Sequence, residues 1–303
     1  MCPAQRLKCV PHVYGSVLIG VLCALILPAR AEQSAKAELP PPVQAQMDDL
    51  ASRVAALLRR PSLRPPNPNL LIVDFSLANS THISRLGTLL ADQLSNSLGR
   101  LASGFVVLDR KPIPDFLRQN WMEPADLSDA DASLWAARQL GANGVIHGQI
   151  AQVKDSMIRL SLRIDGLGPT FYSDQEFTLN DPLTQLLKED APYIPLEPEP
   201  IPPEPGVFAP GQEGVSTPVC EYCPDADYTD IARLLHYNGS VILSVVVGVD
   251  GKVTGIKVVK GAPYGLTKQA VDVLARWRLK PVQKDGKPVP VRVNVETLFH
   301  VSP

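Results

Sequence analysis

The stretch "SVILSVVVGVDGKVTGIKVVK" (residues 240–260) has the pattern of a β-hairpin. Two runs rich in β-branched residues, 240–249 and 252–260, meet at the pair Asp250-Gly251. Runs of this composition predict strands, and Asp-Gly between two strands is typical of a two-residue type I′ turn. We therefore expect two antiparallel strands joined at Asp250 and Gly251, and this hairpin is the centre of a small domain.

Elements on both sides of the hairpin complete that domain. Upstream, residues 228–239 predict a short helix that Gly239 ends. Downstream, the apolar residues Leu266, Ala270, Val273, Leu274 and Trp277 recur at helical spacing. A second turn at Asp285-Gly286 leads into "PVPVRVNVETLF" (residues 288–299), whose alternation predicts a strand with one buried face. The order predicts one helical layer on a three-stranded antiparallel sheet, with Trp277 packing the second helix on that sheet.

Length and composition predict more than this one domain. The chain has 303 residues, enough for about two domains, and 45% of them are hydrophobic. A formal net charge of -2 gives no indication of nucleic acid as a partner. The 30 prolines are unevenly distributed, which indicates linkers between folded units.

The first 31 residues have the features of an export signal. Arg6 and Lys8 precede an apolar run at residues 17–27, and Ala29-Arg30-Ala31 offers small residues for cleavage. As a helix, residues 13–29 would cover about 26 Å, slightly less than the ~30 Å of a bilayer core. Cleavage after Ala31 and retention as a membrane anchor both remain open. Either way, the rest of the chain is expected outside the cytoplasm.

Residues 69–190 predict a mixed α/β sheet domain. Strand patterns at residues 69–75 and 105–108 alternate with a helix capped by Ser80 or Thr81 and with a helix capped by Asp129. Strands at residues 143–150, 157–164 and 170–179 follow, and Asp181-Pro182 opens a last helix. Before this domain, residues 32–68 form an Ala- and Pro-rich stalk. The alternatives for its amphipathic helix at 43–58 are a solvated position, docking on the next domain and a membrane-surface role.

Residues 191–218 predict a linker between the two domains. Proline is too frequent for a helix, and apolar residues are too few for a core. In an extended polyproline conformation, this segment would reach about 87 Å.

The sequence contains no enzyme motif that we recognise, and it predicts no cofactor and no metal site. Glycine-rich phosphate loops, HExxH and GxSxG are absent. Asp74 and Asp109 end predicted strands, where open α/β sheets often bind ligands, but turn or cap roles explain them more simply. His147 stands alone in a predicted strand and is interpreted as a hydrogen-bonded core histidine.

Cys220 and Cys223 in "CEYC" are the strongest indication of a chemical role in the sequence. An oxidoreductase CxxC needs its thiols at a helix N-terminus after a strand, and a zinc site needs two more ligands, for which only His236 and His300 are available. A local disulfide needs nothing else and suits an exported protein. The disulfide is favoured, and the thiol enzyme is kept as a third hypothesis.

The second domain resembles the C-terminal domain of the TonB family over about residues 214–299. The matching positions are Tyr228, Ala232, Gly239 to Val241, Asp250 to Val253, Leu266, Ala270, Trp277 to Pro281 and Asp285 to Val289. Within this match, Gly239, Asp250, Gly251, Trp277, Pro281 and Gly286 are expected to be structural. The resemblance implies a periplasmic energy transducer that binds a short segment of outer-membrane receptors as an added strand and supports energy-dependent transport across the outer membrane. If the chain is anchored, it also implies inner-membrane proton-channel proteins as partners.

The last strand is the expected place for that added strand. An edge strand is normally protected against pairing, and one left open can take up an extended peptide through backbone hydrogen bonds. We expect a proline at Val293 to remove an edge N–H and weaken binding. The alternatives are pairing with a second copy in a homodimer, or cover by the segment that leads into the domain. The predicted binding residues are Val291, Arg292, Val293, Asn294, Val295, Glu296 and Thr297.

Residues 69–190 are similar, more weakly, to the amino-terminal α/β domain of TolB and of curli- and flagellum-assembly lipoproteins. The likeness rests on "LLIVDFS", "LGTLLADQLSNSL", "FVVLDR" and "LGANGVIHGQI" and implies a periplasmic protein-interaction module. His12 and Ser16 stand in the opposite order to the Ser-xxx-His pair of TonB anchors. The alternative function is therefore a signal-cleaved, soluble envelope adaptor without energy transduction.

Overall fold

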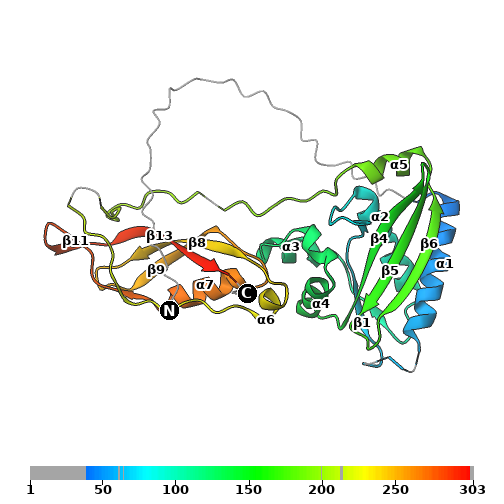
Figure 1. The fold of residues 1–303 in the computed structure, drawn as a ribbon, viewed down its shortest axis with the longest axis horizontal. Coiled ribbons are helices and arrows are strands. Elements are labelled where there is room, and N and C mark those ends of the chain that lie inside the picture. Colours follow the sequence, from blue (N-terminus) through cyan, green and yellow to red (C-terminus); the bar gives the residue numbers. More distant parts are fainter. Residues whose placement is uncertain (1–38, 61, 64, 199, 212–213, 301–303) are drawn as a thin grey trace, which may run out of the picture.

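The computed structural model describes residues 39–300, except 61, 64, 199, 212 and 213, and shows two folded units side by side (Figure 1). The expected export signal, residues 1–31, lies outside the described residues. Among the helices that are described, none is long and apolar enough to cross a membrane.

The first unit is built on a six-stranded mixed sheet in the order β3-β1-β4-β5-β6, with β2 also paired to β4. Strands β1, β2, β3 and β4 pair in parallel, whereas β4, β5 and β6 form an antiparallel meander. The mixed α/β sheet expected from the sequence is therefore present. The strands are β1 (Asn69–Ile72), β2 (Ser76–Leu77), β3 (Val106–Val107), β4 (Gly144–Lys154), β5 (Met157–Asp165) and β6 (Phe171–Thr178).

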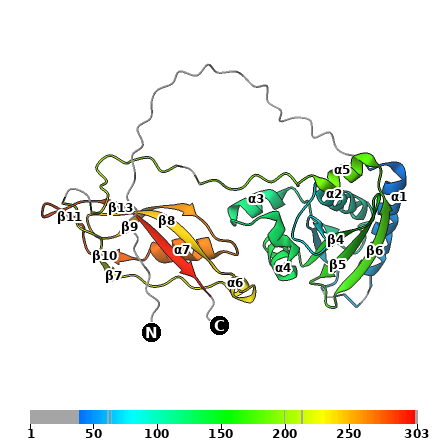
Figure 2. The ribbon, with the colours of Figure 1, turned by 45° about the horizontal axis from the view of Figure 1, so that its top comes forward.

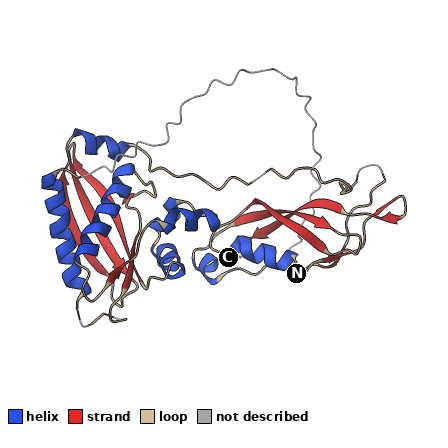
Figure 3. Cartoon of the chain, turned by 180° about the vertical axis from the view of Figure 1, so that it is seen from behind, coloured by secondary structure: helices blue, strands red, loops and turns tan. Residues whose placement is uncertain are grey.

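Helices cover both faces of this sheet (Figure 3). Successive residues of a strand point to opposite faces, so Leu70 and Ile72 pack with α1, α2 and α5, whereas Leu71 and Val73 pack with α3, η1 and α4. The apolar cluster on the α3, η1 and α4 side of the sheet also contains buried residues of the other unit. The helices are α1 (Pro41–Leu58), α2 (Arg85–Arg100), α3 (Pro112–Gln119), η1 (Pro124–Ser128), α4 (Ala130–Gln139) and α5 (Asp181–Lys188).

Helix α1 is part of the first unit and not a separate stalk. Its side chains Met47, Leu50 and Val54 are fully buried in the same core as α2 and the sheet. Of the alternatives for this helix, docking on the domain is the one that the structure shows. The folded unit therefore begins before residue 69, at the start of α1.

The helix caps agree only partly with the sequence analysis. The carboxylate of Asp129 accepts from the amides of Asp131 and Ala132, as expected for the cap of α4. The expectation that Ser80 or Thr81 caps α2 is wrong, because the cap is Ser84, whose hydroxyl accepts from Gly87. Residues 76–77 pair with β4 as β2, and this short strand delays the start of the helix.

The second unit has the helix–strand–strand–helix–strand order that was expected. Strand β13 pairs with β8 and β8 with β9, all antiparallel, in the order β13-β8-β9. The elements are β7 (Cys220–Tyr222), α6 (Asp230–Leu234), β8 (Gly239–Val247), β9 (Val253–Lys260), α7 (Leu266–Leu274), β10 (Arg278–Leu279), β11 (Gln283–Lys284), β12 (Lys287–Pro288) and β13 (Val291–Phe299). Two small ladders, β7 with β10 and β11 with β12, flank the main sheet.

The two Asp-Gly turns differ from each other. Gly251 has φ 76°, but Asp250 is not in the left-handed region, so the expected type I′ turn is wrong for this hairpin. Both Asp285 (φ 49°) and Gly286 (φ 77°) have the positive φ of a type I′ turn. A Cβ on Gly251 would lie 1.9 Å from the carbonyl oxygen of Leu279, so this position needs glycine for space as well as for its backbone angle.

An aromatic seam joins the two units. The ring of Trp135 on α4 meets that of Tyr264 at 6.2 Å between centroids, and Tyr264 meets Tyr237 at 5.8 Å, both edge to face. Gly261 of the second unit lies so close to Trp121 of the first unit that a Cβ on residue 261 would lie 2.0 Å from the ring of Trp121. The buried residues of α3 and α4 and those of the second sheet consequently form one continuous apolar cluster.

The segment from residue 191 onward runs from α5 alongside the second unit to its far end (Figure 2). Near its start, the hydroxyl of Tyr193 donates to the carbonyl of Met122 at 2.8 Å. At the other end, Val215 forms an antiparallel β-bridge with Lys284, and the amide of Ser216 donates to the carbonyl of Gln283 at 2.9 Å. The segment is therefore fixed at both ends and does not act as a free spacer between separated domains.

Candidate functional site

Strand β13 is an edge of the second sheet. Every residue from Val291 to Phe299 has a partner on β8, with no bulge, and the opposite side of β13 has no strand beside it among the described residues (Figure 1). The nine-residue length of β13 offers a long row of backbone groups for a further strand.

One hydrogen bond identifies which backbone groups point away from β8. The amide of Arg292 donates to the carbonyl of Phe208 at 2.9 Å, and Phe208 lies on the outer side of β13. Since backbone groups alternate in direction along a strand, the outward amides belong to Arg292, Asn294, Glu296 and Leu298. The amides of Val291, Val293, Val295 and Thr297 point to β8.

The expected effect of proline at Val293 is therefore wrong in its mechanism. The N–H of Val293 faces Val245 on β8, so its loss would damage the sheet and leave the outer edge unchanged. The neighbouring outward N–H belongs to Asn294. The structure also adds Leu298, which lay outside the predicted binding residues, to the outward row.

Side chains alternate in the same way, with one buried row and one accessible row. Val291, Val293, Val295, Thr297 and Phe299 are buried against the helical layer. On the other face, Asn294 and Leu298 are exposed, with Leu298 at 62%. A strand added to this edge would thus lie beside a row of accessible side chains, which can select its sequence.

A short part of the predicted linker already touches the start of this edge. Phe208 forms a parallel bridge with Val291: its amide donates to Pro290 at 2.9 Å and its carbonyl accepts from Arg292. A carboxylate oxygen of Glu204 lies 2.7 Å from a guanidinium nitrogen of Arg292. The ammonium nitrogen of Lys284 lies 4.6 Å from the centroid of the Phe208 ring. Cover of this edge by the segment that leads into the domain was one alternative from the sequence. The contact of Phe208 itself was not predicted, because one aromatic residue in a proline-rich segment carries no periodic pattern.

The other end of β13 is held by aromatic packing. The ring of Phe299 meets that of Tyr228 edge to face at 5.5 Å, and the hydroxyl of Tyr228 donates to the carbonyl of Tyr237 at 2.8 Å. Burial raises the pKa of Tyr228 above its ordinary value, so this hydroxyl keeps its proton and stays a donor at neutral pH. Both ends of the strand are thus fixed while its middle stays open.

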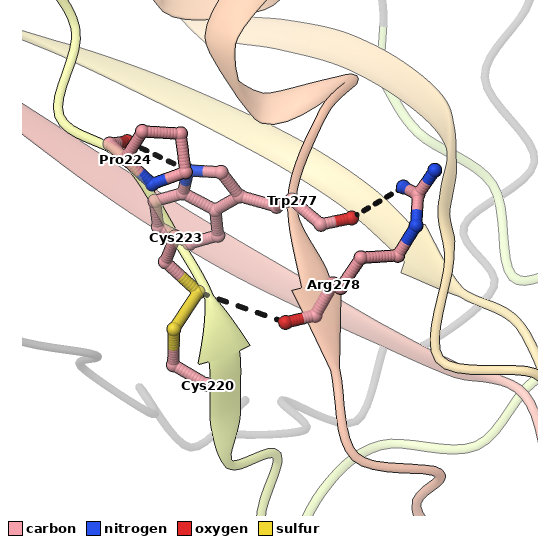
Figure 4. The surroundings of a disulfide bond; sticks show 5 residues. All are labelled: Cys220, Cys223, Pro224, Trp277 and Arg278. Carbon is pink, nitrogen blue, oxygen red and sulfur yellow. Dashed lines mark hydrogen bonds between the residues drawn. A yellow bond between two sulfur atoms is a disulfide. The ribbon is translucent and has the colours of Figure 1, made fainter.

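Cys220 and Cys223 form a disulfide next to Trp277 (Figure 4). Cys220 lies on β7, which pairs with β10, and not at a helix N-terminus as a thiol oxidoreductase would require. The indole of Trp277 is buried and donates to the carbonyl of Pro224 at 2.9 Å. These contacts attach the chain segment that precedes α6 to the end of α7.

The remaining structural candidates lie at strand ends and turns. Gly239 opens β8, and a Cβ there would come within 2.5 Å of the hydroxyl of Tyr237. The carboxylate of Asp250 accepts from the amide of Lys252 at 3.1 Å, which closes the hairpin turn. Gly286 forms the turn between β11 and β12, and Pro281 lies exposed after β10. None of them belongs to the open edge.

In the first unit, the structure places the candidate polar residues in ion pairs. Asp74 is bound by Arg110, which also contacts Asp92 at 2.7 Å. Asp109 caps its own turn by accepting from the amide of Lys111. Asp74 and Asp109 are therefore not brought together in a common site.

His147 is buried and hydrogen-bonded, as the sequence suggested. Its Nε2 lies 2.7 Å from a carboxylate oxygen of Asp165, which also accepts from the hydroxyl of Thr170. Burial alone would raise the pKa of Asp165, but the hydrogen bonds from His147 and Thr170, with the charge of Arg163, hold this pKa below its usual value. Over the described residues, no group of three or more His, Cys, Asp or Glu side chains could hold a metal ion.

The second unit matches the sequence model of the Gram-negative bacterial TonB protein C-terminal at residues 224–301. This match covers α6, the three-stranded sheet, α7 and the open edge. Residues 224–301 are a TonB-type C-terminal domain. Among curated proteins, none matches the chain in sequence.

Two C-terminal domains are among the solved structures with some likeness to this chain. The C-terminal domain of LpoB from Escherichia coli is 14% identical, with a TM-score of 0.33 over 45% of this chain and 97% of that one. The TonB C-terminal domain from Pseudomonas aeruginosa is 19% identical, with a TM-score of 0.26 over 31% of this chain and 92% of that one. At identities and TM-scores this low, neither likeness bears on what the chain does.

Proposed function

We propose that this chain is a periplasmic protein of the TonB type that binds segments of outer-membrane receptors by strand addition to β13. The observation that supports it is the outward row of Asn294, Glu296 and Leu298, whose backbone groups have no partner among the described residues. A peptide strand would satisfy this row with backbone hydrogen bonds worth about 0.5–1.5 kcal/mol each. In this proposal the chain is a binding protein and not an enzyme.

Asn294→Pro tests the proposed site most directly. The substitution removes an outward N–H that β8 does not use, so the domain should stay folded while receptor peptides bind about tenfold more weakly or not at all. Asn294→Ala is the matched control, because it removes the same side chain and keeps the N–H. The measurement is a calorimetric titration with synthetic peptides copied from the periplasm-facing segments of outer-membrane receptors. Equal affinity of both variants would contradict the proposed edge.

A second function, an envelope adaptor without energy transduction, is supported by the aromatic seam. A transducer needs a long spacer between its anchor and its receptor-binding domain, but here a folded unit packs on that domain through Trp135 and Tyr264. N-terminal sequencing of the exported protein separates the two functions. A start at Glu32 would remove the anchor and leave the adaptor, whereas an intact N-terminus would support the transducer and its coupling to proton-channel proteins.

A further inference from the structure

The segment around Phe208 pairs with β13 for one step of a ladder and then leaves it. Phe208 donates to Pro290 and accepts from Arg292, which is a complete parallel bridge. Three residues later, the chain turns away at Gly211, which has φ 76° and whose amide donates to the carbonyl of Val215 at 3.1 Å. Before the bridge, Val207 donates to Glu204 at 3.1 Å in another turn. Only the few residues between these turns run along the edge.

The identity of residue 210 explains why the ladder ends there. In a parallel ladder, alternate residues of the added strand face the neighbouring strand, so residue 210 would follow Phe208. Its amide would donate to the outward carbonyl of Arg292. Residue 210 is proline, which has no N–H, so the next step of the ladder cannot form.

Two side-chain contacts and one further backbone bridge hold Phe208 in this register. Glu204 forms an ion pair with Arg292, and Lys284 stands over the ring of Phe208. The third contact is the bridge of Val215 to Lys284, which fixes the chain just after its turn at Gly211. The segment therefore cannot slide along β13 without losing contacts on both sides of Phe208.

We propose that residues 204–210 act as a built-in stop that sets the register of a partner strand on β13. The inference rests on the proposed function, because it concerns the same edge. Phe208 occupies the outward carbonyl of Pro290 and the outward amide of Arg292, and Pro210 keeps the chain from covering Asn294. A partner strand is thereby confined to the backbone groups from the carbonyl of Arg292 to Leu298 and cannot shift toward the start of β13. Phe208 and Pro210 are positioning residues for that strand.

Amide hydrogen exchange on the full chain without any partner tests the stop itself. In the wild type, the amide of Arg292 should exchange slowly, whereas those of Asn294, Glu296 and Leu298 should exchange fast. Pro210→Ala restores the missing N–H, so the ladder should extend by one step and the carbonyl of residue 210 should accept from the amide of Asn294. Exchange at Asn294 should then slow by about tenfold, which corresponds to one hydrogen bond of ordinary strength.

Pro202→Ala is the matched control, because it relaxes the same proline-rich segment at an exposed position away from the ladder. Slower exchange at Asn294 in Pro210→Ala but not in Pro202→Ala supports the stop. Unchanged exchange at Asn294 in Pro210→Ala overturns it, and so does an Arg292 amide that exchanges as fast as that of Asn294 in the wild type.

A second arm uses the hexapeptide Thr-Val-Thr-Val-Thr-Val, with blocked ends, as a probe of the edge. Under the proposal it binds Pro210→Ala about tenfold more weakly than Pro202→Ala, because Asn294 is already paired. Equal binding to both variants overturns the register. If the probe protects no outward amide of β13 in any variant, strand addition itself fails, and the exchange at Asn294 in the free chain still decides whether the stop exists.

Discussion

The hydroxyl of Tyr264 donates to the carboxylate of Asp126 across the seam between the two units, at 3.3 Å between oxygens. The same carboxylate accepts from the amide of Glu123 at 2.8 Å, so it caps η1 and contacts the second unit at once. Burial raises the pKa of Asp126 above its ordinary value, and these two hydrogen bonds only partly oppose the shift. Burial and the nearby Asp126 charge also raise the pKa of Tyr264, which keeps it a donor.

We predict that Asp126→Asn removes one contribution to the free energy of unfolding that declines as the pH rises through the acid range. A carboxyl whose pKa is raised on folding stabilises the folded state most when it is protonated. Its contribution declines as the pH rises from the ordinary value of 3.8 through the raised folded value. Asparagine keeps the acceptor oxygen for Tyr264 and does not titrate. Urea unfolding of both proteins at a series of pH values should show the wild type losing stability relative to the variant as pH rises, and a constant difference would contradict this.

Gly261→Ala should separate the two units. The added Cβ would lie 2.0 Å from the ring of Trp121, so either that ring moves or the seam opens. Overpacking of this kind costs about 1–3 kcal/mol, which is large for one inter-domain contact. Small-angle scattering should report a larger radius of gyration, with faster proteolysis in residues 191–203. Gly99→Ala, where nothing lies within 4 Å of the new Cβ, is the control and should behave like the wild type.

Trp277→Phe should separate the hydrogen bond of the indole from its apolar packing. Phenylalanine keeps most of the buried ring but leaves the carbonyl of Pro224 without the donor that the indole supplied, so a loss of about 1–3 kcal/mol is expected. Trp277→Ala should cost about 3–5 kcal/mol, because a cavity is added. The measurement is the free energy of unfolding in urea. A Phe variant as stable as the wild type would mean that water replaces the indole at Pro224.

Local patterns in the sequence were sufficient to predict most of the elements of the second sheet and the helix α7 that covers it. The alternation from Val291 to Phe299 and the apolar spacing from Leu266 to Leu274 correspond to β13 and α7, because each pattern reflects one buried face. The cap at Asp129 was predicted for a different reason, because its carboxylate accepts from free amides in the first turn of α4. The type I′ turn at Asp250 was wrong, since the approach of Leu279 to Gly251 sets the backbone there and is a tertiary contact.

Contacts between distant segments were the part that sequence patterns did not reveal. The expected helix at residues 228–239 is only five residues long, since Tyr237 turns inward to meet Tyr264 and Gly239 already belongs to β8. The bridge between Phe208 and Val291 and the seam at Trp135 join residues far apart in the chain. No single-sequence periodicity encodes such pairs. The candidate edge was therefore predicted, and cover by the segment that leads into the domain was one alternative, whereas the pairing of Phe208 with Val291 was not predicted.

Replacing both Cys220 and Cys223 with serine should lower stability but leave peptide binding unchanged. The disulfide closes a short loop, with a sequence separation of 3, so its loss should cost about 2 kcal/mol by the chain-entropy estimate. Strand β7 pairs with β10 and makes no ladder with β13, so the open edge should keep its geometry. Unfolding in urea measures the first effect, and titration with receptor peptides measures the second. Loss of function in a variant that remains folded and binds peptide normally would instead support thiol chemistry at these two residues.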